Sequence, residues 1–133
     1  MRGPSGAGKS DLALRLIDRG ARLVADDRVD LTVRRGRLMA RAPSKLAGLI
    51  EVRGIGVVPM PRRRAAEIVL VADLVELKRV ERMPGSDRGP DRCVLAGVSL
   101  PRLKLAPFEA TAPIKLRLAL LRWARPRQRA RRP

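Results

Sequence analysis

The spacing of hydrophobic residues predicts one helix near the start of the chain and another near its end. In residues 11–19, leucine, alanine and isoleucine recur four positions apart, so one helical face would be apolar, and Gly20 is suited to end the helix. Residues 112–123 repeat this spacing, and Pro113 fits a first helical turn, where its missing N–H is not needed. We therefore expect two amphipathic helices separated by most of the chain.

Between the predicted helices, short apolar segments indicate strands. Residues 22–25 form an apolar run before two aspartates, which is typical of a buried strand, and residues 30–33 and 37–40 flank a glycine-containing turn, as in a hairpin. Residues 66–75 have the continuous β-branched character of a core strand, and residues 93–95 form a shorter candidate. A helix followed by strands favours an α/β fold.

Two glycines interrupt a further strand-like segment, residues 49–58. We interpret Gly54 and Gly56 as a bulge or as a close approach of the backbone to another group. Residues 43–47 are predicted as a single helical turn, and residues 80–91, rich in proline, glycine and charge, as a surface loop.

The composition limits the chemistry that this chain can perform. With 133 residues, 45% of them hydrophobic and only 2% aromatic, we expect one domain with an aliphatic core and without the usual base-stacking platform. The sequence has no histidine and a single cysteine, Cys93, which excludes imidazole catalysis, an intramolecular disulfide and a cysteine zinc site. Acid–base chemistry falls to carboxylates. With no apolar run of membrane-helix length, we expect a cytoplasmic protein without a signal peptide or a membrane partner.

Positive charge dominates the sequence. Lysine and arginine number 30 against 13 acidic residues, a net charge of +17, and 25 of the basic residues are arginine, a bias that a GC-rich coding sequence alone could produce. Six of the arginines lie in residues 122–133, which contain no acid. We predict a domain over residues 1–121 and a basic, disordered tail over residues 122–133. Nucleic-acid binding by that tail is an alternative that we do not favour.

The strongest chemical signal is the segment Gly-Pro-Ser-Gly-Ala-Gly-Lys-Ser at residues 3–10, directly before the first predicted helix. It matches the complete phosphate-loop pattern, in which glycines let backbone N–H groups turn toward the β- and γ-phosphates and the helix N-terminus adds a positive end. Lys9 would supply a mobile cation, and the Ser10 hydroxyl would reach Mg²⁺. A chance match outside any binding site is the alternative.

A phosphate loop ordinarily follows a buried strand, yet only Met1 and Arg2 precede Gly3. We therefore expect the first strand of the sheet to be missing, because the start is misassigned or the chain is truncated. The absence of that strand would leave neighbouring backbone groups in need of other partners.

Two adjacent acids follow the apolar run of residues 22–25. Asp26 and Asp27 stand 17 and 18 residues after Lys9, and the carboxyl ends of strands in a doubly wound sheet face the ligand. One acid could accept the proton of an attacking hydroxyl while the other supports the metal. A turn cap, or an ion pair with Arg28, is the structural alternative.

Glu51 is the one acid in a segment flanked by Ile50 and Val52. A half-buried glutamate on a strand ordinarily needs a metal, a catalytic role or an arginine partner. Arg53 lies two residues further along, on the same face of a strand, so an ion pair between the two is the alternative to a functional role.

Together these residues resemble the catalytic domain of bacterial HPr kinase/phosphorylase. The likeness rests on GPSGAGKSDLALRLIDRGARLVADDRVDL and then LIEVRGIGVV, which is similar to that family's own signature; it is strong over residues 3–58 and weaker to about residue 119. It implies an α/β, phosphate-loop-containing kinase domain with a mixed central sheet and flanking helices. The implied activity is that of an ATP- and Mg²⁺-dependent serine kinase acting on HPr, the phosphocarrier protein of the phosphotransferase system. Many members also remove that phosphate.

The resemblance also implies roles for individual residues. Lys9 and Arg82 would be catalytic, and Asp27 would accept the seryl proton in phosphorylation and return it in the reverse reaction. Ser10 and Glu51 would hold Mg²⁺. The nucleotide would lie on the loop formed by Gly3, Pro4, Ser5, Gly6, Ala7, Gly8, Lys9 and Ser10.

The sequence also departs from the family pattern. The upstream histidine and the amino-terminal regulatory domain of longer members are absent, and residues 100–107 lack the expected dephosphorylation motif, so phosphorylase activity is the part of the function that the resemblance supports least. Short forms of this kind resemble those of alphaproteobacteria. The family further implies a homo-oligomer, which is a hexamer in its known members.

Two other functions stay open. A small-molecule kinase would have only the phosphate loop in common with this chain. The signature-like segment favours a protein kinase over this alternative. The lack of an obvious lid or base-binding aromatic residue also gives the small-molecule kinase little support. A basic module that binds phosphate or nucleic acid without catalysis would show steeply salt-dependent DNA binding. A phosphoserine formed on HPr would exclude that module as the main function.

Overall fold

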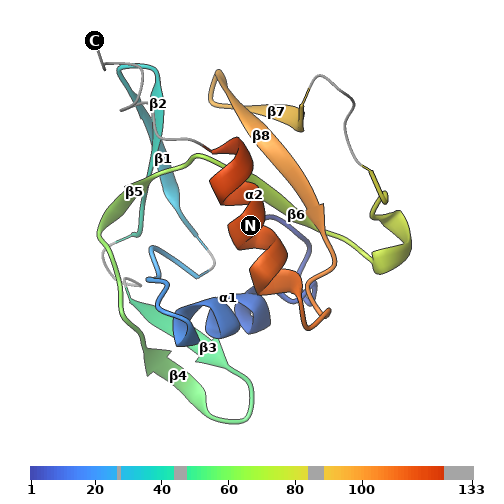
Figure 1. Ribbon diagram of the computed structural model, residues 1–133. Coiled ribbons are helices and arrows are strands. Elements are labelled where there is room, and N and C mark those ends of the chain that lie inside the picture. Colours follow the sequence, from blue (N-terminus) through green and yellow to red (C-terminus); the bar gives the residue numbers. More distant parts are fainter. Residues whose placement is uncertain (27, 44–47, 84–88, 125–133) are drawn as a thin grey trace.

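The computed structural model describes residues 1–26, 28–43, 48–83 and 89–124, and these residues form an α/β structure. Two helices, α1 (Lys9–Asp18) and α2 (Ala112–Trp123), pack on a sheet with the strand order β6 (Val71–Leu74), β8 (Val98–Leu105), β7 (Asp91–Leu95) (Figure 1). The predicted α/β class is confirmed, and α2 has the bounds that the hydrophobic spacing predicts. No helix in the described part of the chain has the length and apolar character needed to cross a membrane.

The sheet of β6, β8 and β7 places the phosphate loop. β6 pairs with β8 in parallel and β7 pairs with β8 antiparallel. Arg2 adds one parallel bridge to the outer side of β6, because its N–H donates to Ala72 O over 2.7 Å and its carbonyl accepts the N–H of Leu74 over 2.8 Å. The chain therefore enters residues 3–10 beside β6, at the carboxyl edge of the parallel strands.

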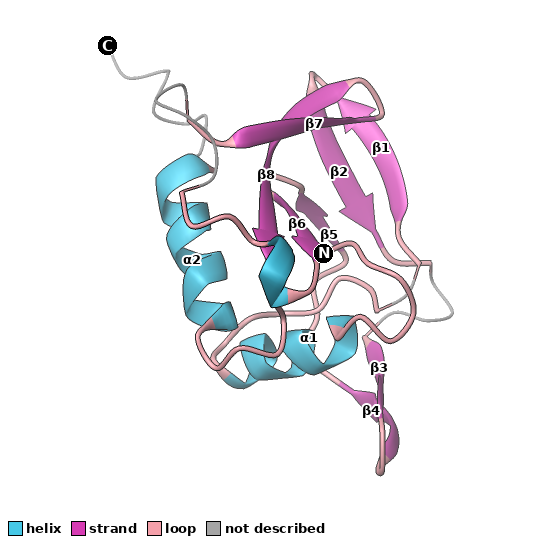
Figure 2. Cartoon of the chain, turned by 90° about the vertical axis from the view of Figure 1, so that its right-hand side faces the viewer, coloured by secondary structure: helices cyan, strands magenta, loops and turns pink. Residues whose placement is uncertain are grey.

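The main hydrophobic core lies between this sheet and the two helices. Its buried side chains come from α1, β6, β8 and α2, so the core fixes both helices relative to the edge where the loop emerges (Figures 1 and 2). The core is aliphatic, as the composition predicts, and its buried members are Leu12, Ala72, Leu74, Leu105, Ala112 and Leu116.

The remaining strands form two smaller sheets. One has the order β1 (Asp30–Arg34), β2 (Arg37–Arg41), β5 (Ala65–Glu67), all antiparallel, and the other is the hairpin of β3 (Leu49–Val52) and β4 (Gly56–Pro59). The predicted turn between β1 and β2 is confirmed. Its two central residues, Arg35 and Gly36, have φ angles of 53° and 74°, and glycine adopts such a value without strain.

Three predicted strands differ in the structure. Residues 49–58 form a hairpin and not one interrupted strand, because Gly54 and Gly56, with φ of 91° and 118°, turn the chain back on itself. Residues 66–75 are divided between β5 and β6, which belong to different sheets. Residues 22–25 are reduced to a single parallel bridge between Leu23 and Arg62.

Proline accounts for the short pairing at Leu23. The Leu23 N–H donates to Pro61 O over 2.8 Å, and Arg63 N–H donates to Leu23 O over 3.0 Å. The ladder cannot continue toward the start of the chain, because Pro61 has no N–H to donate.

Several predictions fall on segments that the structure describes only in part. Of the helical turn predicted at residues 43–47, positions 44–47 lie outside the described residues, and of the loop predicted at residues 80–91, positions 84–88 do. Residues 125–133 of the predicted tail also lie outside them, whereas α2 continues through Arg122 and Trp123.

Candidate functional site

The phosphate-loop segment begins at Gly3 and leads straight into α1. Gly6 and Gly8 have φ angles of 81° and 98°, so the backbone takes left-handed turns that other residues would adopt only with strain. Within the described residues, the N–H groups of Gly6, Gly8, Lys9 and Ser10 donate to no carbonyl or side-chain acceptor. Four donors are therefore available at the start of a ten-residue helix, an arrangement suited to an anion.

Lys9 lies across this loop. Its Nζ donates a hydrogen bond to Gly3 O over 2.8 Å, so the ammonium group is held between the first residue of the loop and the start of α1. The side chain is partly buried. A cation at this position supplies a positive charge beside the free N–H groups. Phosphate oxygens bind to such a combination of a charged donor and backbone donors.

One carboxylate joins the loop to the β3–β4 hairpin. Ser10 Oγ donates to Asp26 Oδ1 over 3.0 Å, and Asp26 Oδ2 accepts the backbone N–H of Glu51 over 3.3 Å. Ser10 and Glu51 are 41 positions apart in sequence, yet both contact the same side chain. The structure thus brings together the two predicted metal ligands through Asp26, a residue that was predicted only as one member of an acidic pair.

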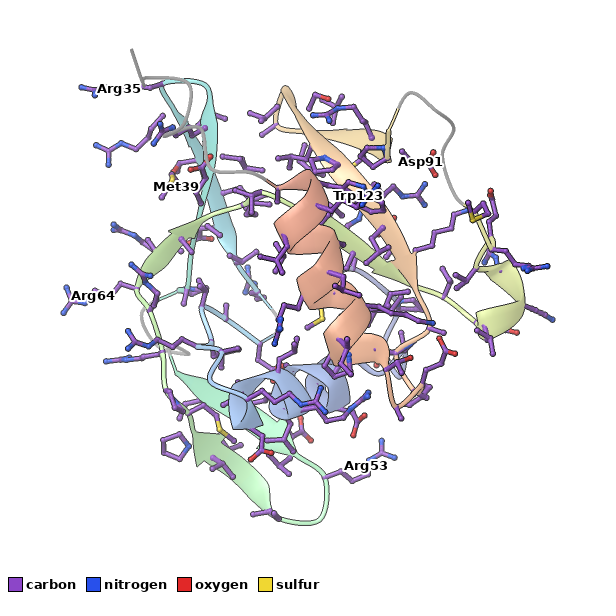
Figure 3. The ribbon with its side chains drawn as sticks, viewed as in Figure 1. Arg35, Met39, Arg53, Arg64, Asp91 and Trp123 are labelled. Carbon is purple, nitrogen blue, oxygen red and sulfur yellow. The ribbon has the colours of Figure 1, made fainter. Side chains whose placement is uncertain are left out.

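The ion-pair alternatives are not observed for the two acids that the structure describes, Asp26 and Glu51. Within the described residues, no ion pair joins Asp26 to Arg28 or Glu51 to Arg53. Arg53 extends away from the strands at the turn of the β3–β4 hairpin (Figure 3). Glu51 is exposed, which leaves its carboxylate accessible to a ligand.

The contacts described above do not include two other predicted catalytic residues. Asp27 lies outside the described residues. Arg82 is exposed on the segment after the 3-10 helix η2 (Leu77–Arg79), where it makes no hydrogen bond or ion pair with any other described residue. Their roles stay predictions.

An aromatic ring lies against the phosphate loop. A Cβ atom added to Gly8 would be 2.9 Å from Phe108 Cζ and 3.1 Å from Pro107 Cγ, so only glycine fits at this position without a shift of these side chains. Phe108 follows β8 and is 71% exposed. Sequence reasoning missed this contact, because nothing in the spacing of Gly8 and Phe108 indicates that they meet.

Arg15 fixes the segment that carries this ring. Its guanidinium donates to the carbonyl of Pro107 and, over 3.1 Å, to that of Glu109, and it also forms an ion pair with Asp11 over 2.9 Å. The two carbonyls flank Phe108 on either side. Arg15 therefore ties the connection between β8 and α2 to the helix that begins at the phosphate loop.

An ion-pair network stabilises the entry to the loop. Asp73 on β6 accepts hydrogen bonds from Arg2, at 2.6 and 2.9 Å, and from Arg102 on β8. The hydrogen bonds from Arg2 lower the pKa of the Asp73 carboxyl, and the bond from Arg102 lowers it further. This carboxylate is only 14% exposed and joins the residue just before the loop to both parallel strands.

These residues fit a phosphate group and a divalent cation. With respect to the described part of the chain, the loop offers four N–H donors without an acceptor, and together with the Lys9 ammonium they suit phosphate oxygens. The oxygens of Ser10, Asp26 and Glu51 suit Mg²⁺. Mg²⁺ ordinarily takes few ligands from the protein where the oxygens of substrate phosphates complete its coordination shell. No cluster of three or more acidic, histidine or cysteine residues occurs among the described residues.

The sequence pattern of the HPr Serine kinase C-terminal domain matches residues 1–111 of the chain. The chain belongs to this family. The prediction made from the loop and the signature-like segment is thereby confirmed. The family domain includes every element of the site described above, from the loop to the connection that carries Phe108.

Individual relatives agree with this membership. The chain is 34% identical over 117 residues to the HPr kinase/phosphorylase of Clostridium tetani and 37% identical over 113 residues to that of Clostridium novyi, in each case over 85% of this chain and 37% of the relative. It therefore spans little more than a third of the length of these curated relatives. The solved structure of the Hpr(Ser) kinase/phosphatase from Coxiella burnetii has a TM-score of 0.73 and 28% identity, covering 90% of this chain and 82% of that one.

Proposed function

We propose that this chain is the catalytic part of an ATP-dependent serine kinase that phosphorylates HPr, the phosphocarrier protein of the phosphotransferase system, in the cytoplasm. The observation that carries the proposal is the contact of Asp26 with both Ser10 and Glu51. It joins the phosphate loop, which many nucleotide-binding proteins have, to the signature-like strand, which ordinary phosphate-loop enzymes do not share. The names of the relatives in Clostridium tetani and Clostridium novyi support the same activity.

The residues divide the work of phosphoryl transfer among them. Bound ATP would supply the phosphoryl group, and Mg²⁺ would offset its charge. Lys9 and the free N–H groups of the loop bind and orient the phosphates, and Ser10 and Glu51 hold the metal, with Asp26 keeping them in register. Asp27 accepts the seryl proton, and Arg82 stabilises the transferred charge.

The finer predictions belong to the same proposal. The loop-bearing sheet of β6, β8 and β7 serves as the mixed central sheet of a phosphate-loop kinase, residues 1–121 form the domain, and residues 122–133 a basic tail. A homo-oligomer is the proposed assembly, and a short form of the alphaproteobacterial type the proposed subgroup. Phosphorylase activity is the least supported part of the function.

The decisive experiment is incubation of the protein with ATP, Mg²⁺ and purified HPr, followed by intact mass measurement. We expect HPr to gain the mass of one phosphoryl group on serine, and Lys9→Ala to abolish the gain. If HPr gains no mass, the proposal is wrong. Phosphorylation of a small hydroxyl compound instead would indicate a small-molecule kinase, and salt-dependent DNA binding without transfer would indicate a non-catalytic module.

A further inference from the structure

We propose that Phe108 is the base-binding platform of the nucleotide site, on which the base of a nucleoside triphosphate stacks while its phosphates lie on the loop. The inference rests on the proposed nucleotide-binding function and deepens it. It assigns a binding role to the only phenylalanine of the sequence, although the low aromatic content of the sequence suggests that a base-stacking residue is lacking.

The position of the ring is the first argument. Phe108 Cζ and Cε1 would lie 2.9 and 3.1 Å from a Cβ on Gly8, so the ring contacts the backbone of the very residue that precedes Lys9. β8 delivers it to the carboxyl edge of the parallel strands, where open α/β sheets bind their ligands. A nucleotide held by its phosphates on this loop has its base at the same edge.

The exposure of the ring is the second argument. Pro107, just before it, is buried, whereas Phe108 is 71% exposed beside a loop of glycines. A ring that served only to fill the space left by Gly8 would bury most of its surface. The free surface of Phe108 is available to a planar group such as a base, which would bury apolar area by stacking on the ring.

The rigid support of the ring is the third argument. Arg15 donates hydrogen bonds to the carbonyls of Pro107 and Glu109, the residues on either side of Phe108. Lys115 adds an ion pair to Glu109 over 2.8 Å, which ties the same segment to α2. An exposed side chain on a backbone held from two helices costs little further ordering when it binds a ligand.

This chemistry also predicts the kind of specificity. Every base has a π-face, so stacking on Phe108 tolerates changes of base. ATP and GTP should therefore bind with similar affinity, because both carry a purine, whose larger ring system can stack on Phe108. Inorganic triphosphate, which has the phosphates but no base, should not use Phe108 at all.

The test compares ATP, GTP and inorganic triphosphate, each with Mg²⁺, by calorimetry on the wild type and on Phe108→Ala. We expect Phe108→Ala to raise the Kd for both nucleotides about 5- to 100-fold and to leave the Kd for triphosphate unchanged. Phe108→Trp should restore nucleotide binding. Leu118→Ala, a matched change of an apolar residue 57% exposed on α2, should change none of the three.

A second readout follows the ring directly. Because Phe108 is the only phenylalanine, selective isotope labelling gives one set of ring signals, which ATP should shift and triphosphate should leave in place. Equal weakening of ATP and triphosphate by Phe108→Ala would show that the ring only supports the loop, and unchanged binding of both would show no role; either result overturns the inference alone. A wild type that binds neither ligand would overturn the proposed nucleotide function and the inference with it.

Discussion

The hydroxyl of Ser10 and the carboxylate of Asp26 are joined by a hydrogen bond of 3.0 Å, in which Ser10 is the donor. The second oxygen of Asp26 accepts the N–H of Glu51. Asp26 thus holds the Ser10 hydroxyl and the backbone of Glu51, whose carboxylate is the prospective metal ligand, without itself having to bind the metal. Loss of an outer partner of this kind typically lowers metal affinity about 10- to 100-fold.

Asp26→Asn should therefore weaken nucleotide binding only when Mg²⁺ is present. The amide keeps one acceptor oxygen but loses the charge and one of the two acceptors, so we expect the Kd for Mg–ATP to rise about 10- to 100-fold. Calorimetric titrations with ATP in Mg²⁺ and in a chelator measure the difference. Asp18→Asn, an exposed acid at the other end of α1, is the matched control; an equal effect of both variants would point to net charge alone.

Lys9→Ala should weaken nucleotide binding with or without Mg²⁺. The change removes the ammonium group that lies across the loop, and charged hydrogen bonds of this kind contribute about 1.5–3 kcal/mol. We expect the Kd for ATP to rise by one to two decades. Lys104→Ala on β8 serves as the control in the same titration, and equal affinity of wild type and Lys9→Ala would contradict the phosphate-loop assignment.

Asp27→Asn should separate binding from turnover. An amide of the same size cannot accept the seryl proton, so kcat on HPr should fall by about 10²–10⁴ while ATP affinity stays within a few-fold. Phosphate transfer rates at saturating ATP measure the effect. If Asp26→Asn instead gives this pattern, the base is the first acid of the pair, and near wild-type turnover of both variants would rule out a carboxylate base here.

Gly8→Ala should damage the loop and its aromatic neighbour together. The alanine would have to adopt a φ near 98°, and its methyl group would lie 2.9 Å from Phe108 Cζ. Left-handed strain alone costs about 1–3 kcal/mol, so we expect a lower melting temperature together with weaker ATP binding. Gly20→Ala has a similar φ of 103° but no neighbour within 4 Å, and it should lower the melting temperature without affecting ATP binding.

Asp73 should make the stability depend on pH in the acidic range. Its pKa is lowered in the folded protein by hydrogen bonds from Arg2 and Arg102, so the unfolded state takes up a proton first as the pH falls below about 4. The stabilisation is complete above that pH and is lost as the pH falls through the folded pKa. Urea unfolding between pH 7 and pH 2 should show Asp73→Asn to be less stable at pH 7, by about 1 kcal/mol, with the difference vanishing at the acidic end. A constant difference would show that the carboxylate charge is not the cause.

The sequence predicted best those features that depend on neighbours along the chain. Residues 112–123 form α2 as expected, because an apolar spacing of three and four and a proline in the first turn are enough to define a helix. The Arg35–Gly36 turn was predicted equally well, since the two residues themselves supply the positive φ angles. The helix after the phosphate-loop segment, predicted over residues 11–19 and observed as α1 over Lys9–Asp18, depends on the same kind of local signal.

Features that depend on distant pairing were missed. The apolar run at residues 66–75 is divided because the Ile68 N–H donates to Leu38 O, after which the chain crosses to pair with β8, and no local pattern records such a change of partner. β8, the longest strand, was not predicted because it contains Pro101. That proline precedes the four residues that pair with β6, so its missing N–H costs no bond in the parallel ladder.

The site shows the same division. The motif alone predicts Lys9 and Ser10 as site residues, whereas the bridging of Ser10 and Glu51 by Asp26 and the contact of Phe108 with Gly8 arise only when separate segments fold together. From the sequence, the acidic residues near a phosphate loop can be proposed only as a group. Which of them contacts the other site residues depends on the path of the chain. That path is set by the sheet and not by the motif.

The bridge between Arg2 and Asp73 spans 71 positions, and this separation bears on how the protein is made. During translation the phosphate-loop residues are synthesised before β6, β8 and the ring that lies against Gly8. Until at least residue 108 has emerged from the ribosome, the loop therefore lacks its supporting strands and its contact with Phe108. Chains released early or stalled before that point would carry the complete motif but have no fold in which to use it.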